Sequence, residues 1–229
     1  ADDMALVGRL KDEETLSKYF THVDFLNEWF KSSFLQLNVG KTKEMIFGGK
    51  SDVCCPPKVR ISDKEVELVE TFKYLVVSID NKLTFSDHVN AVYKKAQQRL
   101  FLLRKLKYFN VNQSVMELVY QSLIESILTF NIVTWYGTIN VKNKAKLHRI
   151  VVTASKLVGQ PQRQQTSLYE ATIKWKAIKI VRDPIHPLNP CFEILPSGKC
   201  YKAPLARKNQ FKKSFLPSAV TILNSSRIT

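Results

Sequence analysis

Residues 72–107 read FKYLVVSIDNKLTFSDHVNAVYKKAQQRLFLLRKLK and combine two kinds of secondary-structure signal. Residues 72–80 are rich in aromatic and β-branched side chains, which is typical of a strand or a hairpin. From Phe85 to Lys107 apolar residues recur every three or four positions, so this part is predicted to form an amphipathic helix. A strand-rich segment that leads directly into a long helix indicates the α+β class.

The sequence before residue 72 predicts one helix and several short strands. Asp12 can cap a helix whose apolar residues recur at helical spacing as far as Phe30. Strands are expected at Glu44–Phe47, Lys58–Ile61 and Glu65–Val69. One helix with short antiparallel strands is therefore the architecture that we expect for this part of the chain.

After residue 107 the pattern becomes mainly helical. Helices are predicted over 115–128 and 141–158, which belong to a helical region over 81–160. Residues 161–229 contain one further predicted helix, over 167–181, among glutamines and prolines that interrupt regular structure. We expect this last part to be a Pro/Gln-containing linker with an irregular basic C-terminal tail.

Four short motifs follow one another in an order that is more informative than any one of them. They are Ala1-Asp2-Asp3, Leu37-Asn38 with Lys41-Thr42-Lys43, Phe72-Lys73-Tyr74-Leu75, and the segment Asp80–Lys107. In this order and spacing they resemble the C-terminal half of a reverse transcriptase from a non-LTR (LINE-type) retrotransposon, over essentially the whole chain. The resemblance implies a truncated polymerase palm edge with a primer-grip-like hairpin over 1–80, followed by a thumb-like helical region.

The first two motifs are implied to carry vestiges of catalysis. Asp2 and Asp3 would be catalytic carboxylates and metal ligands for the Mg²⁺ of this family, because Mg²⁺ prefers hard oxygen ligands. Lys41 or Lys43 would neutralise the leaving pyrophosphate, and a lysine in a solvated loop is the alternative. A two-metal centre also needs a carboxylate from a separate strand, which in this family precedes the Asp-Asp motif. We therefore expect no bound metal and no polymerase activity.

The third motif is implied to position the primer strand. Its residues would be Phe72, Lys73, Tyr74 and Leu75. The family usually continues with glycine, which tolerates positive φ, whereas this sequence has Val76. Either the turn is made differently here or the position has drifted.

Charge is divided unevenly along the chain. The 229 residues carry 35 Lys and Arg against 20 Asp and Glu, a formal net charge of +15. Residues 1–80 hold 11 basic and 14 acidic side chains (−3), and residues 81–229 hold 24 basic and 6 acidic ones (+18). Because Lys and Arg neutralise phosphates, this favours non-specific binding of an RNA or DNA duplex by the C-terminal part.

The helix predicted from Phe85 to Lys107 is best placed for such binding. Its cations stand among aromatic residues that can stack on bases, and the predicted helix over 141–158 has a similar basic pattern. A basic face that is only solvated is the alternative. The candidate nucleic-acid-binding residues of this helix are Lys94, Lys95, Arg99, Arg104 and Lys105.

Residues 83–110 also resemble a short segment of the N-terminal domain of AlkB-type alkylated-DNA-repair homologues. The resemblance implies a 2-oxoglutarate-dependent oxygenase or tRNA methyltransferase family, although this segment does not carry the catalytic residues of such enzymes. His22 and Asp24 match two ligands of a non-haem iron site, but residues two apart on a helix do not face each other. We therefore expect no activity from the AlkB-like segment.

Cysteine spacing and hydropathy indicate the compartment. Cys54-Cys55, Cys191 and Cys200 match no ordinary zinc spacing. No apolar run approaches the roughly 18 residues of a membrane span. Without a signal peptide or a disulfide framework, we expect a cytoplasmic or nuclear protein that is neither secreted nor bound to a membrane.

Two classes of function stay open. In one, the chain is a catalytically inactive reverse-transcriptase fragment with residual, non-specific affinity for nucleic acid. In the other, it is a non-functional or protein-interaction remnant.

Overall fold

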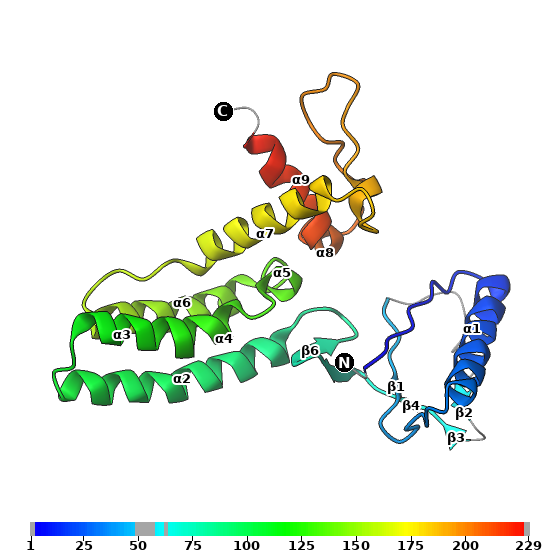
Figure 1. Ribbon diagram of the computed structural model, residues 1–229, viewed down its shortest axis with the longest axis horizontal. Helices are drawn as coiled ribbons and strands as arrows, with labels where there is room; N and C mark the ends of the chain where they lie inside the picture. Colours follow the sequence, from blue (N-terminus) through cyan, green and yellow to red (C-terminus); the bar gives the residue numbers. More distant parts are fainter. Residues whose placement is uncertain (1–2, 49–57, 62–63, 227–229) are drawn as a thin grey trace. The chain divides into compact units, whose positions relative to one another are not determined.

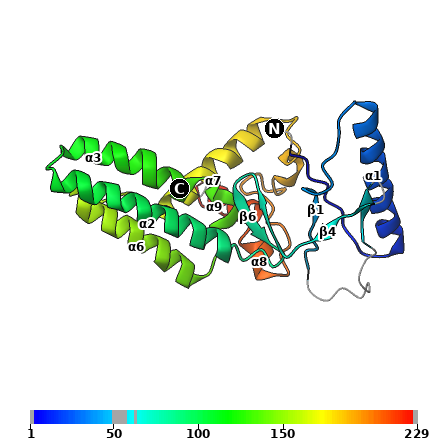
Figure 2. The same ribbon diagram turned by 90° about the horizontal axis from the view of Figure 1, so that it is seen from below.

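The structure, a computed structural model, describes residues 3–48, 58–61 and 64–226, which divide into two compact units (Figures 1 and 2). The first unit ends at Lys82 and the second begins at Leu83. Within the described residues, the first unit has one long helix and short strands, whereas the second is mainly helical. The predicted α+β class is confirmed.

The first unit is organised by helix α1 (Glu13–Ser32), which begins where the sequence predicts. The Thr15 N–H donates to Asp12 Oδ1 at 2.9 Å, and the Asp12 N–H donates to the Thr15 hydroxyl at 3.1 Å, so the two residues cap the helix reciprocally. These bonds to the charged form lower the pKa of the Asp12 carboxyl. Beneath the helix lies a small apolar core of Val23, Val59, Ile61 and Val66, against which Tyr19, Phe20, Leu37 and Val39 pack.

The strands of the first unit are short and pair two by two. They are β1 (Lys43–Glu44), β2 (Arg60–Ile61), β3 (Lys64–Glu65), β4 (Glu67–Leu68), β5 (Thr71–Tyr74) and β6 (Val77–Asp80). β2 pairs with β3, and β5 with β6, in the antiparallel sense that we expected. β1 and β4 pair in parallel instead, because the long segment between them allows a crossover connection.

The β5–β6 hairpin shows how the turn is made with Val76 at a position where glycine was expected. Tyr74 pairs with Val77, which leaves a loop of two residues, Leu75 and Val76. Their φ angles are 44° and 72°, so the turn is made with two consecutive left-handed residues. Such turns favour Asn-Gly because the twist matches the strands, but a β-branched side chain is strained there. The turn therefore has the backbone conformation that glycine favours, although neither of its two residues is glycine.

The strained turn predicts a stabilising substitution. Replacing Leu75-Val76 by Asn-Gly removes the steric cost of two left-handed residues, which is about 1–2 kcal/mol each. The added glycine costs up to about 1 kcal/mol in conformational entropy, so we expect the free energy of unfolding of the first unit to rise by about 1–3 kcal/mol, measured by urea denaturation. The control Val76→Ala removes the β-branch but keeps a Cβ, so it should recover less. A double variant no more stable than the parent would contradict the assignment of strain.

The second unit packs long helices side by side (Figure 1). Trp135 is fully buried and donates its indole N–H to the Phe130 carbonyl at 3.0 Å. α2 packs against α6 and against the run α3–η1–α4, and α7 packs against α5 and α9. The elements are α2 (Ser86–Tyr108), α3 (Gln113–Val119), the π-helix η1 (Tyr120–Glu125), α4 (Ser126–Thr129), α5 (Ile132–Trp135), α6 (Val141–Val158), α7 (Gln165–Arg182), the 3₁₀ turn η2 (Asn189–Cys191), α8 (Asn209–Lys212) and α9 (Phe215–Ser225).

Local sequence explains where α6 begins and ends. The Asn140 side chain accepts the Asn143 N–H at 2.8 Å at the start of the helix. Gly159 ends the helix with a φ of 85°, a left-handed position that glycine takes without steric cost. The helix predicted over 141–158 is therefore confirmed.

The π-helix η1 disturbs the regular hydrogen-bond ladder, and two arginines bind beside it. Arg99 of α2 donates to the Leu123 carbonyl at 2.5 Å. Arg163 reaches from the loop before α7 to the buried Glu125 carboxylate, also at 2.5 Å. A π-turn releases carbonyl groups from helical bonding, so the Arg99 guanidinium is a suitable partner for the Leu123 carbonyl, whereas Arg163 neutralises the Glu125 carboxylate.

The last part of the chain is more regular than the linker and tail that we expected. α7 and α9 pack together within the second unit, and the Asn224 amide exchanges hydrogen bonds with the Tyr201 backbone at 2.8 and 3.0 Å. Ala219, Val220 and Leu223 of α9 are buried. Within the described residues, none of the helices combines the length and the apolar character needed to cross a bilayer.

Burial of His88 predicts a pH dependence of stability. His88 packs edge-on against Trp135 with ring centroids 5.2 Å apart, and desolvation, together with the Lys95 charge, lowers its pKa below 6.5. The unfolded state therefore binds a proton more readily, so stability should fall as pH drops through 6.5 and level off below the depressed folded pKa. Urea unfolding between pH 7.5 and 5 should show this loss, and His88→Gln should reduce its slope. An unchanged slope in the variant would assign the loss to other groups.

Candidate nucleic-acid interface

The residues implied in catalysis do not form a visible centre. Asp2 lies outside the described residues, and Asp3 is exposed in irregular chain. Lys41 is exposed in a turn, where its backbone N–H donates to Asn38 Oδ1 at 3.1 Å. Nowhere in the described ranges do three His, Cys, Asp or Glu residues come together as metal ligands. The roles of Asp2, Asp3 and Lys41 stay predictions.

The primer-grip-like residues lie on β5 and its turn. Phe72 and Tyr74 are half-buried, whereas Lys73 and Leu75 are exposed, as the alternation of a strand requires. One lysine and one apolar tip therefore face solvent from this hairpin. Their contact with a primer strand remains a prediction.

The five cations predicted on α2 do not share one face. Arg99 turns towards η1 and is engaged with the Leu123 carbonyl. Lys94, Lys95 and Lys105 are exposed, with the Lys105 ammonium 5.5 Å from the Phe101 ring centroid. Lys94 and Lys105 each follow a residue that lines the groove, so they stand about 100° further around the helix. Arg104 alone lines the groove between α2 and α6. Whether a cation of α2 is exposed or engaged depends on whether another helix covers its side of α2.

A second row of cations comes from α6. Lys142, Lys146, Arg149 and Lys156 are spaced by four, three and seven residues, so they lie along one side of the helix. Two contacts show that this side borders α2. The Lys146 ammonium donates to Asn90 Oδ1 at 2.7 Å, and the Lys107 ammonium donates to the Lys156 carbonyl at 2.8 Å.

This row of α6 and the α2 residues Arg104 and Lys107 form a basic surface along the junction of the two helices, which we call the basic seam. In the part of the chain that the structure describes, none of its members forms an ion pair. The Lys146 ammonium also lies 4.9 Å from the ring centroid of Tyr93, a cation–π contact. The members of the basic seam are Arg104, Lys107, Lys142, Lys146, Arg149 and Lys156.

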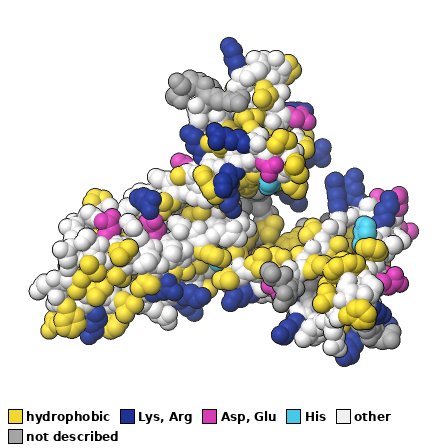
Figure 3. Space-filling view, viewed as in Figure 1, with side chains coloured by type: hydrophobic (Ala, Val, Ile, Leu, Met, Phe, Trp, Pro, Cys, Tyr) yellow, Lys and Arg dark blue, Asp and Glu magenta, His cyan; other side chains and the backbone are white. Residues whose placement is uncertain are grey.

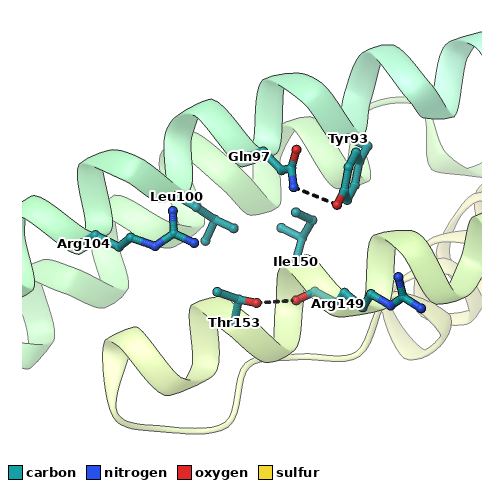
Figure 4. Close-up of a pocket in the computed structure, with 7 residues that line it drawn as sticks. All are labelled: Tyr93, Gln97, Leu100, Arg104, Arg149, Ile150 and Thr153. Atoms are coloured by element: carbon teal, nitrogen blue, oxygen red, sulfur yellow. Dashed lines mark hydrogen bonds between the residues drawn. The ribbon is translucent and has the colours of Figure 1, made fainter.

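A cavity of about 320 Å³ opens in the basic seam (Figure 4). Leu100 and Ile150 point towards each other between the two helices, and a hydrogen bond of 2.7 Å joins the Gln97 amide to the Tyr93 hydroxyl. The seven lining residues are Tyr93, Gln97, Leu100, Arg104, Arg149, Ile150 and Thr153.

The electrostatics of the seam are one-sided. α2 and α6 together carry eleven Lys and Arg residues, and their only acidic residue is Asp87, in the first turn of α2. Lys144 belongs to another side of α6, where its ammonium lies 4.9 Å from the Tyr136 ring and burial lowers its pKa. A concentration of cations without carboxylates attracts polyanions.

A different surface lies at the end of the second unit where α2 meets α3. Figure 3 shows hydrophobic side chains gathered there. Large apolar residues of this end are solvent-exposed, Phe109 by 70% and Leu118 by 64%. An exposed apolar patch of this kind is typical of a protein contact.

The remaining candidates of the sequence carry no visible site. Cys54 and Cys55 lie outside the described residues, whereas Cys191 and Cys200 are free thiols. His22 and Asp24 are both exposed within α1.

Two comparisons with known proteins give matches, and a third gives none. Residues 86–126 match the family described as alkylated DNA repair protein alkB homolog 8, N-terminal. The chain is also 22% identical over 183 residues to the RNA-directed DNA polymerase from mobile element jockey of Drosophila melanogaster. This similarity covers 76% of the chain and 19% of the relative, so the chain spans about a fifth of the relative's length. No solved structure is significantly similar.

Both resemblances inferred from sequence are supported in their coarse form. The chain is distantly similar to a retrotransposon reverse transcriptase, and its local similarity to an AlkB homologue's N-terminal domain is confirmed. The latter covers residues 86–126 rather than 83–110, which is α2, α3, η1 and the first residue of α4.

The different surroundings of Arg99 and Arg104 predict different effects on stability. Arg99→Met leaves the half-buried Leu123 carbonyl without its charged donor, which should lower the free energy of unfolding of the second unit by about 1 kcal/mol or more. Arg104→Met, in the same helix, should change it by less than about 0.5 kcal/mol. Chemical denaturation of both variants tests the assignment. Equal losses of stability in the two variants would mean that the hydrogen bond from Arg99 to Leu123 does not stabilise the second unit.

Proposed function

We propose that the chain is a reverse-transcriptase-derived fragment whose second unit binds nucleic-acid backbones non-specifically along the basic seam. The observation that carries the proposal is the seam itself, in which cations of two helices line one groove without a carboxylate partner. Phosphates are the polyanions that such a row recognises, and the ion release on binding makes affinity salt-dependent.

Charge and similarity support this choice of ligand. Residues 83–229 hold 23 basic and 6 acidic side chains, a net charge of +17, against −2 for residues 1–82 with 12 basic and 14 acidic. The relative from mobile element jockey is an RNA-directed DNA polymerase by its name. A fragment derived from such a polymerase would keep residual affinity for an RNA or DNA duplex. Such a fragment would act in the cytoplasm or the nucleus.

The proposal is limited to binding. Asp2 lies outside the described residues, and Asp3 alone supplies one carboxylate of a centre that needs several. We therefore propose neither polymerisation nor a bound Mg²⁺ for these 229 residues. The AlkB-type match likewise contributes a helical segment, and no oxygenase or methyltransferase activity is proposed from it.

A second candidate function is a protein contact. It is favoured by the exposed apolar side chains of Phe109 and Leu118 at the junction of α2 and α3. Salt separates the two candidates, because phosphate binding weakens as salt rises whereas an apolar contact does not.

A filter-binding titration at two salt concentrations tests nucleic-acid binding. We expect micromolar or weaker affinity for a primer–template duplex, with a negative slope of log K against log[salt]. The double variant Lys142→Ala, Arg149→Ala removes two seam cations and should reduce the slope on a duplex by about 1.8.

The matched control removes two cations from the same unit outside the seam. Lys94→Ala, Lys105→Ala lowers the net charge equally but changes exposed residues that stand about 100° around α2 from the groove-lining Tyr93 and Arg104. We expect its salt slope to stay close to that of the parent. No binding at low salt, or equal losses in both double variants, would refute the seam as the binding surface.

A further inference from the structure

Helix α7 carries an exposed tryptophan on the side opposite its buried residues. α7 packs against α4, α5 and α9, and Ile173 and Ala177 are fully buried. Trp175 lies two residues from each of them, about 160° around the helix, and is 55% exposed. In α7, all of whose residues the structure describes, Trp175 is the one large apolar side chain that is exposed. The packing of α7 therefore leaves this indole accessible to a ligand.

Two cations share the exposed side of α7 with this tryptophan. Lys179 and Arg182 follow Trp175 by four and seven residues, a spacing that places all three on one side of the helix. The Lys179 ammonium lies 4.0 Å from the Trp175 ring centroid, a cation–π contact on one face of the indole. Among the residues that the structure describes, neither cation forms an ion pair. Glu170, the only acidic residue of α7, stands about 140° around the helix from Trp175.

An exposed aromatic ring with adjacent cations matches the chemistry of a nucleic-acid strand. Proteins that bind single strands stack bases on aromatic rings and neutralise the backbone with nearby cations. Lys179 and Arg182 stand about 6 and 10 Å along the helix axis from Trp175, so their long side chains can reach phosphates that adjoin a stacked base. A bilayer fits less well, because a helix that lies in a membrane interface buries several apolar side chains, and α7 exposes one.

We infer that the side of α7 formed by Trp175, Lys179 and Arg182 binds an unpaired nucleic-acid strand, with one base stacked on the indole and the adjoining phosphates at the two cations. The inference rests on the proposed function and deepens it, because it adds a contact that distinguishes single strands from duplexes. In a duplex the internal bases stay stacked on one another, so only an unpaired base can reach the indole. The basic seam contacts phosphates alone and does not make this distinction.

The tryptophan emission of the protein tests the stacking directly. Of the three tryptophans, Trp135 is fully buried and Trp29 is 43% exposed in the first unit. The variant Trp29→Phe therefore keeps Trp175 as its one exposed emitter. Oligothymidine at low salt should quench the emission of this variant, because a stacked base quenches indole fluorescence. An abasic strand of equal length carries the same phosphates and should bind without this quenching.

Affinities connect the stacked base to residue 175. The parent should bind oligothymidine about tenfold more tightly than the abasic strand, the order of one stacked base. Trp175→Ala should remove this difference and leave duplex affinity unchanged, whereas Trp175→Phe keeps an aromatic face and should retain most of it. The matched control Trp29→Ala makes the same replacement at the other exposed tryptophan and should leave all affinities unchanged.

The outcomes separate this inference from the proposed function. Equal affinities of the parent for oligothymidine and the abasic strand, or no loss in Trp175→Ala, would overturn the α7 contact while leaving salt-dependent duplex binding intact. Quenching by vesicles of anionic lipid but not by oligothymidine would assign this side of α7 to a membrane and overturn it too. Failure of every strand to bind at low salt would overturn both proposals. Circular dichroism identifies a variant that has lost its fold, and the comparison of strands on the parent needs no variant.

Discussion

The apolar contact between α2 and α6 is the interaction on which the second unit depends, because it holds together two helices of like charge. Leu100 of α2 and Ile150 of α6 point towards each other between the helices and are almost fully buried, and Ala96 and Ala154 of the same two helices are fully buried. Burying one such large side chain is worth about 1.5–3 kcal/mol. Repulsion between two exposed cations at 4 Å in water is about 1 kcal/mol and is screened by salt. The free energy of apolar burial therefore outweighs the repulsion between the cations. The two helices stay packed although both are positively charged.

The same contact explains why a basic groove arises here. Long cationic side chains that flank an apolar stripe extend their ammonium or guanidinium groups to its solvent edge. When two such stripes meet, the flanking cations of both helices line one groove. An anion bound in this groove reduces the repulsion that the packing tolerates, so we expect binding and stability of the second unit to be coupled. Helix packing and the basic seam thus have one physical origin.

The sequence alone predicts the bounds of the helices well. It does not predict which face of a helix is covered by its neighbours. The caps at Asn140 and Gly159 are local signals, so the bounds of α6 follow from the residues themselves. Which cations of α2 meet a partner depends on the helices beside it, and nothing near Arg99 in the sequence points to the Leu123 carbonyl. The π-helix η1 has the same periodic pattern as an α-helix of its length and is visible only once the structure is known. The parallel pairing of β1 with β4 is likewise a long-range choice.

The extent of the two similarities bears on the origin of the basic seam. The AlkB-type match ends at residue 126 and includes α2 but not α6, so it contains only one of the two rows of cations. The similarity to the jockey polymerase covers 76% of the chain, and a continuous span of that length includes both α2 and α6 wherever it begins. Of the two similar spans, the polymerase-like one therefore contains both helices of the seam. The seam does not exist until α6 covers α2, so a segment of α2 and α3 alone offers cations without a groove.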